Sequence, residues 1–220
     1  MTQWAEKYMS IADLLAVSIS ADSGPQAEQL NDAPAILRED LMFPYLDGLS
    51  FIEGVYARGG WAAVDKLYSS PPDSTSQILH PDLYTSKIEP VILTLSGAPA
   101  ALGPGWALSM QNTMGELQLR VWLEGEHPTD AQKKAADSAA SMWAGDRIGL
   151  WEGPGGAWAV VLRTQWRSAA GRTAFVDAAD HALNGLAGVT SICGDAVHAD
   201  IVLASNQPTM AAFSTCSPTE

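Results

Sequence analysis

Basic residues are scarce in this 220-residue chain: 12 Lys and Arg stand against 25 Asp and Glu, which gives a net charge of −13. A surface of that sign repels the phosphate backbone of nucleic acids, and no basic helix or arginine run offsets it. Long hydrophobic runs are missing as well, because no stretch reaches the roughly 18 apolar residues that a membrane-spanning helix needs. The sequence therefore predicts neither nucleic-acid binding nor a membrane span.

Cysteine is almost as rare, with only Cys193 and Cys216 in the chain. Neither belongs to a CxxC pattern, so the sequence predicts no zinc knuckle and no thioredoxin-type site. The two could form one disulfide in an exported protein or remain thiols in a cytosolic one. We favour the disulfide, because the coil-rich C-terminal tail otherwise has little to hold it in place.

Catalytic motifs are absent too. The chain has no HExxH zinc motif, no GxSxG nucleophile motif and no phosphate-binding P-loop. The glycine-rich PGG at 154–156 lies between two predicted strands, whereas a phosphate-binding loop follows a strand and opens a helix. We therefore expect no catalytic residue, metal ligand or cofactor, and the sequence leans against an enzyme without deciding the question.

Two clusters of acidic residues with histidine are the nearest approach to a metal site, at 124–127 in LEGEHP and at 195–200 in GDAVHAD. Carboxylate and imidazole groups of this kind could hold a divalent cation. However, His198 and Asp200 alternate along a predicted strand opposite its apolar residues, which is typical of a solvated face. We favour solvated side chains over a metal at both clusters.

What the chain does have is a dense run of aromatic, glycine and proline residues at 43–84. Apolar residues three and four apart predict one helix from about residue 47, which Gly59 and Gly60 end, and a second helix that starts at Trp61. Ser74 and Gln77 then match the capping box of a short third helix. The stretch is the helical centre of the predicted fold.

This stretch has two interpretations. Packing alone explains it if its large apolar side chains fill a helical core, with Phe43, Phe51, Trp61 and Leu67 buried. Alternatively, residues that combine an apolar body with a polar tip form a recognition surface for a ligand or partner: Tyr45, Trp61, His80 and Tyr84. We favour packing and keep the second set as the candidate site.

The periodicity of the whole chain predicts an α+β fold. Helical spacing at 3–20 and 32–41 extends the helical region over 1–87. Region 88–220 mixes strands with helices: the β-branched run 88–95 favours a buried strand, and the segments on either side of PGG form a β-hairpin. We expect one globular unit, in which the helical N-terminal half packs on a small, mostly antiparallel sheet with helices.

The helices of the second region are predicted from their caps. Thr113 and Glu116 match a capping box, but the apolar residues of 114–123 alternate, so we expect a helix that soon gives way to a strand.

Thr129 and Gln132 match another box, which heads a helix over 130–143 that Gly145 caps. Ser168 caps a further helix that ends at Gly185. Asp146 and Arg147 are expected to fix a loop through an ion pair.

Several phrases resemble, in the same order, a group of bacterial exported proteins that are predicted relatives of zinc metallopeptidases. They are FPYLDGLSFIEGVYARGGWAAVDKLY, PPDSTSQILHPDLY, TMGELQLRVWL, WAGDR and TQWRSAAGRTAFVDA, and they span roughly residues 40–180. The group carries an HExxH helix and a later glutamate before the FPY segment. Neither has a counterpart here, so no ligand carries over, and Arg167 stands where the group tends to have an acidic residue.

The resemblance implies a non-catalytic C-terminal part of a longer, secreted or cell-envelope protein, or a relative that lost the catalytic half. We favour the first, because the chain opens inside an amphipathic helix without a leader. The helical region would then brace or line a substrate cleft of the missing part, and the partner would be a protein or peptide such as that missing N-terminal half. The alternative is a stand-alone envelope binding or scaffold domain with an aromatic surface. A third hypothesis, an enzyme using Glu116 and His80 as an acid/base pair, requires those side chains to meet in a pocket.

Overall fold

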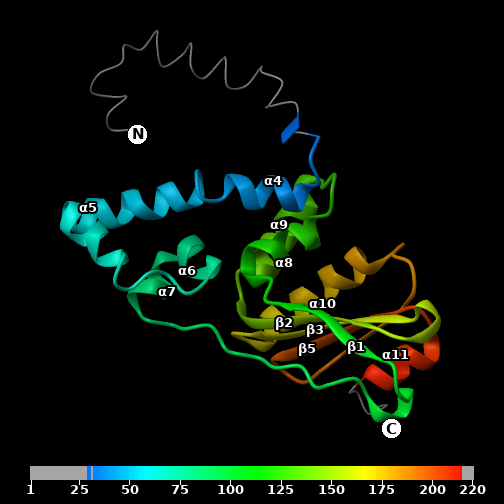
Figure 1. Ribbon diagram of the computed structural model, residues 1–220. Coiled ribbons are helices and arrows are strands. Elements are labelled where there is room, and N and C mark those ends of the chain that lie inside the picture. The colour runs from blue at the N-terminus through cyan, green and yellow to red at the C-terminus, as the bar shows by residue number, and fades with distance from the viewer. Residues whose placement is uncertain (1–28, 31, 215–220) are drawn as a thin grey trace.

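The computed structural model of the chain describes residues 29–30 and 32–214. Over this part the fold is α+β, as predicted: helices form the N-terminal half and a five-stranded antiparallel sheet with helices forms the C-terminal half (Figure 1). The helices of the first half are α4 (Ala35–Met42), α5 (Asp47–Leu67), α6 (Thr75–Leu79) and α7 (Pro81–Thr85). The helix expected at 3–20 lies outside the described residues.

The sheet has the strand order β1-β2-β3-β5-β4, and every neighbouring pair is antiparallel. Its strands are β1 (Ala107–Asn112), β2 (Trp143–Glu152), β3 (Trp158–Trp166), β4 (Val189–Cys193) and β5 (His198–Ala204). The predicted hairpin is confirmed as β2 and β3, joined by the 3-10 turn η2 (Pro154–Gly156). Gly155 and Gly156 both have positive φ there, 68° and 77°, which glycine adopts at little cost.

Three helices cover one face of the sheet: α8 (Gly115–Glu124), α9 (Asp130–Ala140) and α10 (Ala169–Leu183). The core between them and the sheet contains Trp143, Trp166 and Phe175, each at most 2% exposed. The rings of Trp166 and Phe175 stack with centroids 4.4 Å apart. The predicted caps of α9 and α10 are confirmed, since both bonds of the Thr129 capping box form and the Ser168 hydroxyl accepts the Gly171 amide.

The expected change from helix to strand at 114–123 is wrong, because α8 is helical from Gly115 to Glu124. The misleading alternation arises from two stripes with i, i+4 spacing on one buried helix. Leu117 and Val121 pack against α4, and Leu119 and Leu123 pack into the core against the sheet. A helix covered on two sides by protein therefore gives the two-residue apolar period of a strand.

The helix expected at 130–143 ends at Ala140, and Gly145 lies inside β2 instead of capping a helix. Trp143 pairs across β2 and β3 with Trp166. Both indoles are buried in the core, so tertiary burial decides the state of this segment over its local alanine-rich helix propensity.

The opposite face of the sheet is covered by α11 (Gln207–Phe213), the 3-10 helix η1 (Ala100–Leu102) and residues 88–106, which we call the strap. Figure 1 shows the strap leaving α7 and running along this face. The strand predicted at 88–95 is wrong: between 88 and 99 the strap has no regular secondary structure, and its one backbone bond to the sheet joins the Val91 amide to the Ala144 carbonyl at 2.8 Å. Its apolar residues pack flat on the sheet instead of entering the ladder.

Glycines on β2 and directly after it allow this close approach. Gly145 and Gly149 of β2 and Gly153, which follows the strand, recur every fourth residue on the face that the strap covers. A Cβ added at Gly145 would lie 2.2 Å from the Val91 carbonyl oxygen, and one at Gly149 would lie 2.7 Å from a methyl carbon of Leu95. Any larger residue would therefore push the strap off the sheet.

The helical half connects to the sheet through α8. Phe43 at the end of α4 shares a buried cluster with Leu117 and Val121 of α8. Helix α5 breaks at Gly59 and Gly60, as predicted, and Gly60 takes a φ of 62°. Among the described helices, none combines the length and apolar composition that crossing a bilayer requires.

Candidate functional site

The four predicted recognition residues do not form one surface. Tyr45 and Trp61 are 71% and 60% exposed on the helical half. Tyr84 instead packs edge-on against Phe51 with centroids 5.5 Å apart, and its hydroxyl donates to the Ser70 carbonyl. His80 contacts Glu116 of α8. The structure therefore splits the set into two exposed aromatic residues and two that hold elements together.

Burial of Trp61 was expected and is wrong, whereas Phe43 and Phe51 are buried and Leu67 is half-buried. Trp61 follows the break at Gly60, and its ring packs edge-on against that of Tyr56, with the ring centroids 5.2 Å apart. It belongs to a set of large apolar side chains that α4 and α5 leave exposed, which we call the helical face: Leu37, Leu41, Tyr45, Leu46, Leu49, Trp61 and Tyr68. A single exposed leucine is ordinary, whereas a concentration of this kind on and between two consecutive helices makes the helical face a candidate interaction surface.

A groove of about 530 Å³ runs beside the helical face. Its walls are apolar, and they come from the start and end of α5 and from the prolines that follow it. The lining residues include Phe43, Phe51, Val64, Leu67, Tyr68, Pro71, Pro72 and Ile78. A partner that covers the helical face could insert apolar side chains here.

The segment STSQILH at 74–80 joins the helical half to the sheet half. Ser74 caps α6, as predicted, by accepting the Gln77 amide. The reciprocal bond of the capping box is not made, because the Gln77 side chain accepts the Asp73 amide and donates to the Ile88 carbonyl. Thr75 turns towards the other half, where its hydroxyl accepts the Leu117 amide in the first turn of α8.

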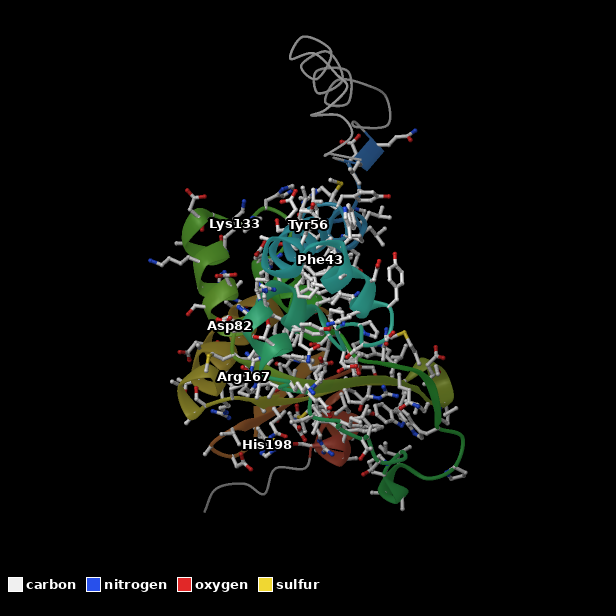
Figure 2. The ribbon with its side chains drawn as sticks, turned by 90° about the vertical axis from the view of Figure 1, so that its left-hand side faces the viewer. Phe43, Tyr56, Asp82, Lys133, Arg167 and His198 are labelled. Carbon is white, nitrogen blue, oxygen red and sulfur yellow. The ribbon has the colours of Figure 1, made fainter. Side chains whose placement is uncertain are left out.

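Ser76 extends this joint to the sheet. Its hydroxyl, 1% exposed, accepts a hydrogen bond from Nη2 of Arg167 at 2.7 Å. Arg167 also donates to the Ser141 carbonyl at 2.7 Å. Burial lowers the pKa of Arg167, and the nearby Glu116 carboxylate opposes that shift. Figure 2 places Arg167 between Asp82 of α7 and His198 of β5, where the helical half meets the sheet.

His80 and Glu116 do meet, with Nε2 and Oε1 separated by 2.6 Å. The glutamate is only 3% exposed, and its Oε2 makes no hydrogen bond within the described part of the chain. The His80 side chain is 39% exposed. The acid/base hypothesis requires the two side chains to meet in a pocket. They meet, but neither lines the 810 Å³ cavity described below. The pair instead links the end of α6 to α8.

Asp146 is the most heavily bonded carboxylate near the joint. It accepts hydrogen bonds from the Met114 and Gly115 amides at 2.8 Å and from the Trp143 indole at 2.9 Å. It therefore caps α8 from a neighbouring strand, in place of the box expected from Thr113 and Glu116. Burial raises the pKa of Asp146, and its three donors oppose that rise.

The ion pair expected between Asp146 and Arg147 does not form. The two are consecutive residues of β2, so their side chains point to opposite faces of the sheet. Arg147 lines an open cavity of about 810 Å³ that is bordered by the strap, the first turn of α6 and the start of α8. The residues along its walls include Asp73, Thr75, Glu89, Val91, Ile92, Leu93, Thr113, Met114, Trp143, Asp146 and Arg147.

The two acidic clusters have structural partners. Glu126 accepts the Ala35 amide, and Asp195 accepts the Val197 and His198 amides, whose hydrogen bonds lower its pKa to about 2. The solvated face expected for Asp200 is wrong: it is 9% exposed and pairs with Arg163 at 2.9 Å. Among the described residues, no three acidic, histidine or cysteine side chains are grouped to hold a metal.

Cys193 is the last residue of β4, and Cys216 lies outside the described residues. The disulfide between them therefore stays a prediction. The sequence analysis did not predict the cavity, and of the helical face it predicted only Tyr45 and Trp61. The signal for the first was the glycine spacing of WAGDRIGLWEG, and the signal for the second was Leu37 and Leu41 on the side of α4 opposite its buried residues.

Residues 107–213 match the model of a family described as a domain of unknown function, DUF8575. The match runs from β1 to α11 and leaves the helical half outside the matched residues. No curated protein and no solved structure matches the chain. The matched family has no stated activity, so function has to be argued from the two surfaces described above.

Proposed function

We propose that this chain is the non-catalytic C-terminal domain of a metallopeptidase-like exported protein. In this proposal the helical face packs against the metallopeptidase-like part that the sequence resemblance implies, and the helical half braces or lines its substrate cleft. The observation that carries the proposal is the concentration of exposed apolar residues on α4 and α5, where seven large apolar side chains lie between residues 37 and 68.

The energetic argument is that this surface gains by being covered. Burying one Leu or aromatic side chain is worth about 1.5 to 3 kcal/mol, so a partner covering Tyr45, Trp61 and their neighbours would gain several such contributions. The adjoining groove offers the concave, apolar shape in which interface anchors lie. The secreted or cell-envelope location expected from the resemblance belongs to the same proposal.

The direct test is co-expression with the polypeptide encoded immediately upstream of the Met1 codon. The proposal expects that polypeptide to contain HExxH and to co-elute with this chain in a 1:1 complex. The double variant Tyr45→Ser, Trp61→Ser should weaken the complex by at least about a hundredfold, since two aromatic anchors are lost. The matched control is Met110→Ser, which removes a 51% exposed apolar residue from β1 and should leave the affinity unchanged.

Metal analysis tests the non-catalytic part of the proposal. The purified chain should contain no stoichiometric zinc and should cleave no peptide, whereas the complex with its HExxH-bearing partner should hold one zinc. One tightly bound zinc per isolated chain would overturn the proposal.

The alternative is a stand-alone binding or scaffold domain at the cell envelope that uses the same aromatic surface. The exposure of Tyr45 and Trp61 favours it equally. An upstream reading frame without HExxH, together with saturable binding that the double variant abolishes, would select this alternative over the bracing domain.

A further inference from the structure

The strap exposes an unused row of backbone hydrogen-bonding groups beside the cavity. Over the described residues, neither Ile92 nor Leu93 makes a hydrogen bond through its amide or carbonyl, and the only backbone bond from the strap to the sheet is that of Val91. The Ile92 side chain is 90% exposed. An extended chain with free edges is the template that peptides use when they bind by adding a strand.

The cavity wall beside Ile92 and Leu93 carries the guanidinium of Arg147, which donates no hydrogen bond to any described residue. Arg147 has no hydrogen bond and no ion pair with any described residue, although it is only partly exposed. Its cross-strand neighbour is Arg163, which is occupied by Asp200 and by the Thr94 carbonyl of the strap. Like charges directly opposite each other on a sheet destabilise it, and a ligand carboxylate at Arg147 would remove that cost.

We propose that the 810 Å³ cavity binds an extended peptide segment that carries a carboxylate. The carboxylate pairs with the Arg147 guanidinium through two parallel N–H···O bonds, and the peptide backbone pairs with the free amide and carbonyl groups of Ile92 and Leu93. The site is independent of the helical face, because it lies between the strap, β2 and the first turns of α6 and α8.

The remaining charges of the cavity limit the ligand. Asp73 and Glu89 line the same cavity and are exposed, so their repulsion of an anion is screened by salt, whereas Arg147 is partly shielded from solvent. Asp146 lines the cavity as well and its charge attracts Arg147, but its oxygens accept three other hydrogen bonds and make none with the guanidinium. The ligand therefore presents one carboxylate to Arg147 and otherwise apolar or neutral side chains towards Val91 and Trp143.

The test uses the full chain and three synthetic peptides. The first is Ac-Val-Thr-Val-Ala-Val with a free C-terminal carboxylate, the second is its C-terminal amide, and the third is Ac-Val-Thr-Glu-Thr-Val amide, which carries the carboxylate on a side chain. Binding is followed by two-dimensional amide NMR. The free acid or the glutamate peptide should bind and shift the amide signals of Ile92 and Leu93. Which of the two peptides binds shows whether the site takes a C-terminal or a side-chain carboxylate.

Substitution of Arg147 separates the carboxylate contact from the backbone contact. Arg147→Gln should weaken binding of the carboxylate-bearing peptide by about tenfold to a hundredfold, the loss expected for a charge-assisted pair. It should leave binding of the amide peptide unchanged. Arg58→Gln removes an exposed arginine of α5 as the matched control and should change nothing. N-methylation of the two central peptide nitrogens should weaken binding to both the wild type and Arg147→Gln, because it removes backbone donors.

Three outcomes would overturn the proposal. They are equal affinity of Arg147→Gln and wild type for the acid, shifts confined to residues outside the strap, and no saturable binding of any peptide at millimolar concentration. Retained folding of Arg147→Gln is checked by the same spectra.

Discussion

The two halves of this molecule differ in how far they bury their tryptophans. Trp166 in the sheet half is 2% exposed and stacks on Phe175, whereas Trp61 in the helical half is 60% exposed and packs edge-on against the Tyr56 ring. The sheet half has helices on one face and the strap with α11 on the other, so its strands are covered on both sides. The helical half packs against α8 and the α6–α7 turn, and within residues 29–30 and 32–214 no further element covers its outer side.

The difference is that the sheet half buries its apolar residues within the fold, whereas the helical half leaves several exposed. Buried apolar residues of β2, β3 and β5 pack against the helices or the strap. Within the described part of the chain, the helical half buries Phe43, Phe51, Val55 and Val64 and leaves the helical face exposed, which is the surface that the proposed partner would cover. Helix α8 packs with both halves, because its two apolar stripes face α4 and the sheet core.

The largest expected effect compares the two tryptophans directly. Trp166→Ala should lower the free energy of unfolding by about 3 to 5 kcal/mol, because a fully buried aromatic leaves a large cavity. Trp61→Ala should change it by no more than about 0.5 kcal/mol, as for other surface positions. Chemical denaturation of both variants measures this. Equal losses would mean that the helical face is already covered within the chain.

The next effect concerns the shared helix. Asp146→Asn keeps the size of the side chain but replaces one acceptor oxygen with a donor group, so at least one of the Met114, Gly115 and Trp143 N–H groups loses its partner. We expect a loss of about 2 to 3 kcal/mol, the range for hydrogen bonds to a buried charged group. Because α8 holds both halves, far-UV and near-UV signals should be lost together, and separate transitions would contradict this role.

A smaller effect is expected where the strap meets β2. Gly145→Ala places a methyl group against the Val91 carbonyl and should cost about 1 to 3 kcal/mol, the range for overpacking. Gly97→Ala is the matched control on the strap, since nothing lies within 4 Å of the added carbon. Limited proteolysis should cut the strap faster in the first variant only. Equal cutting of the two variants would show that the strap does not depend on the glycine at 145.

The smallest effect lies in an exposed turn of the sheet half. Asp195 has a pKa of about 2 in the fold, below the ordinary value of 3.8, because backbone amides donate to it. A lowered pKa stabilises the fold above pH 3.8, and this contribution is lost as the pH falls towards 2. Asp195→Asn should be less stable than the wild type at neutral pH, and the two stabilities should converge as the pH falls towards 2, because the wild type loses this contribution there. An unchanged acid limb in urea titrations at pH 2 to 5 would contradict it.

Much of the fold could be predicted because its signals are local. The hairpin follows from glycines at a turn, the break in α5 follows from Gly59 and Gly60, and the caps of α9 and α10 follow from Thr129 and Ser168. The candidate site was predicted only in part. Tyr45 and Trp61 are exposed as a recognition surface needs, but His80 and Tyr84 are bound to Glu116 and Ser70, partners 36 and 14 residues away.

By itself the sequence determined the starts of α9 and α10, the break in α5 and the β2–β3 hairpin, since caps and turns act between residues a few positions apart. Only the tertiary structure decided that α8 stays helical under two layers of protein, that residues 88–95 lie on the sheet instead of in it, and that Arg147 faces a cavity. Each of these depends on which distant segment covers a surface, and the spacing of residues within one segment does not identify the segment that packs on it.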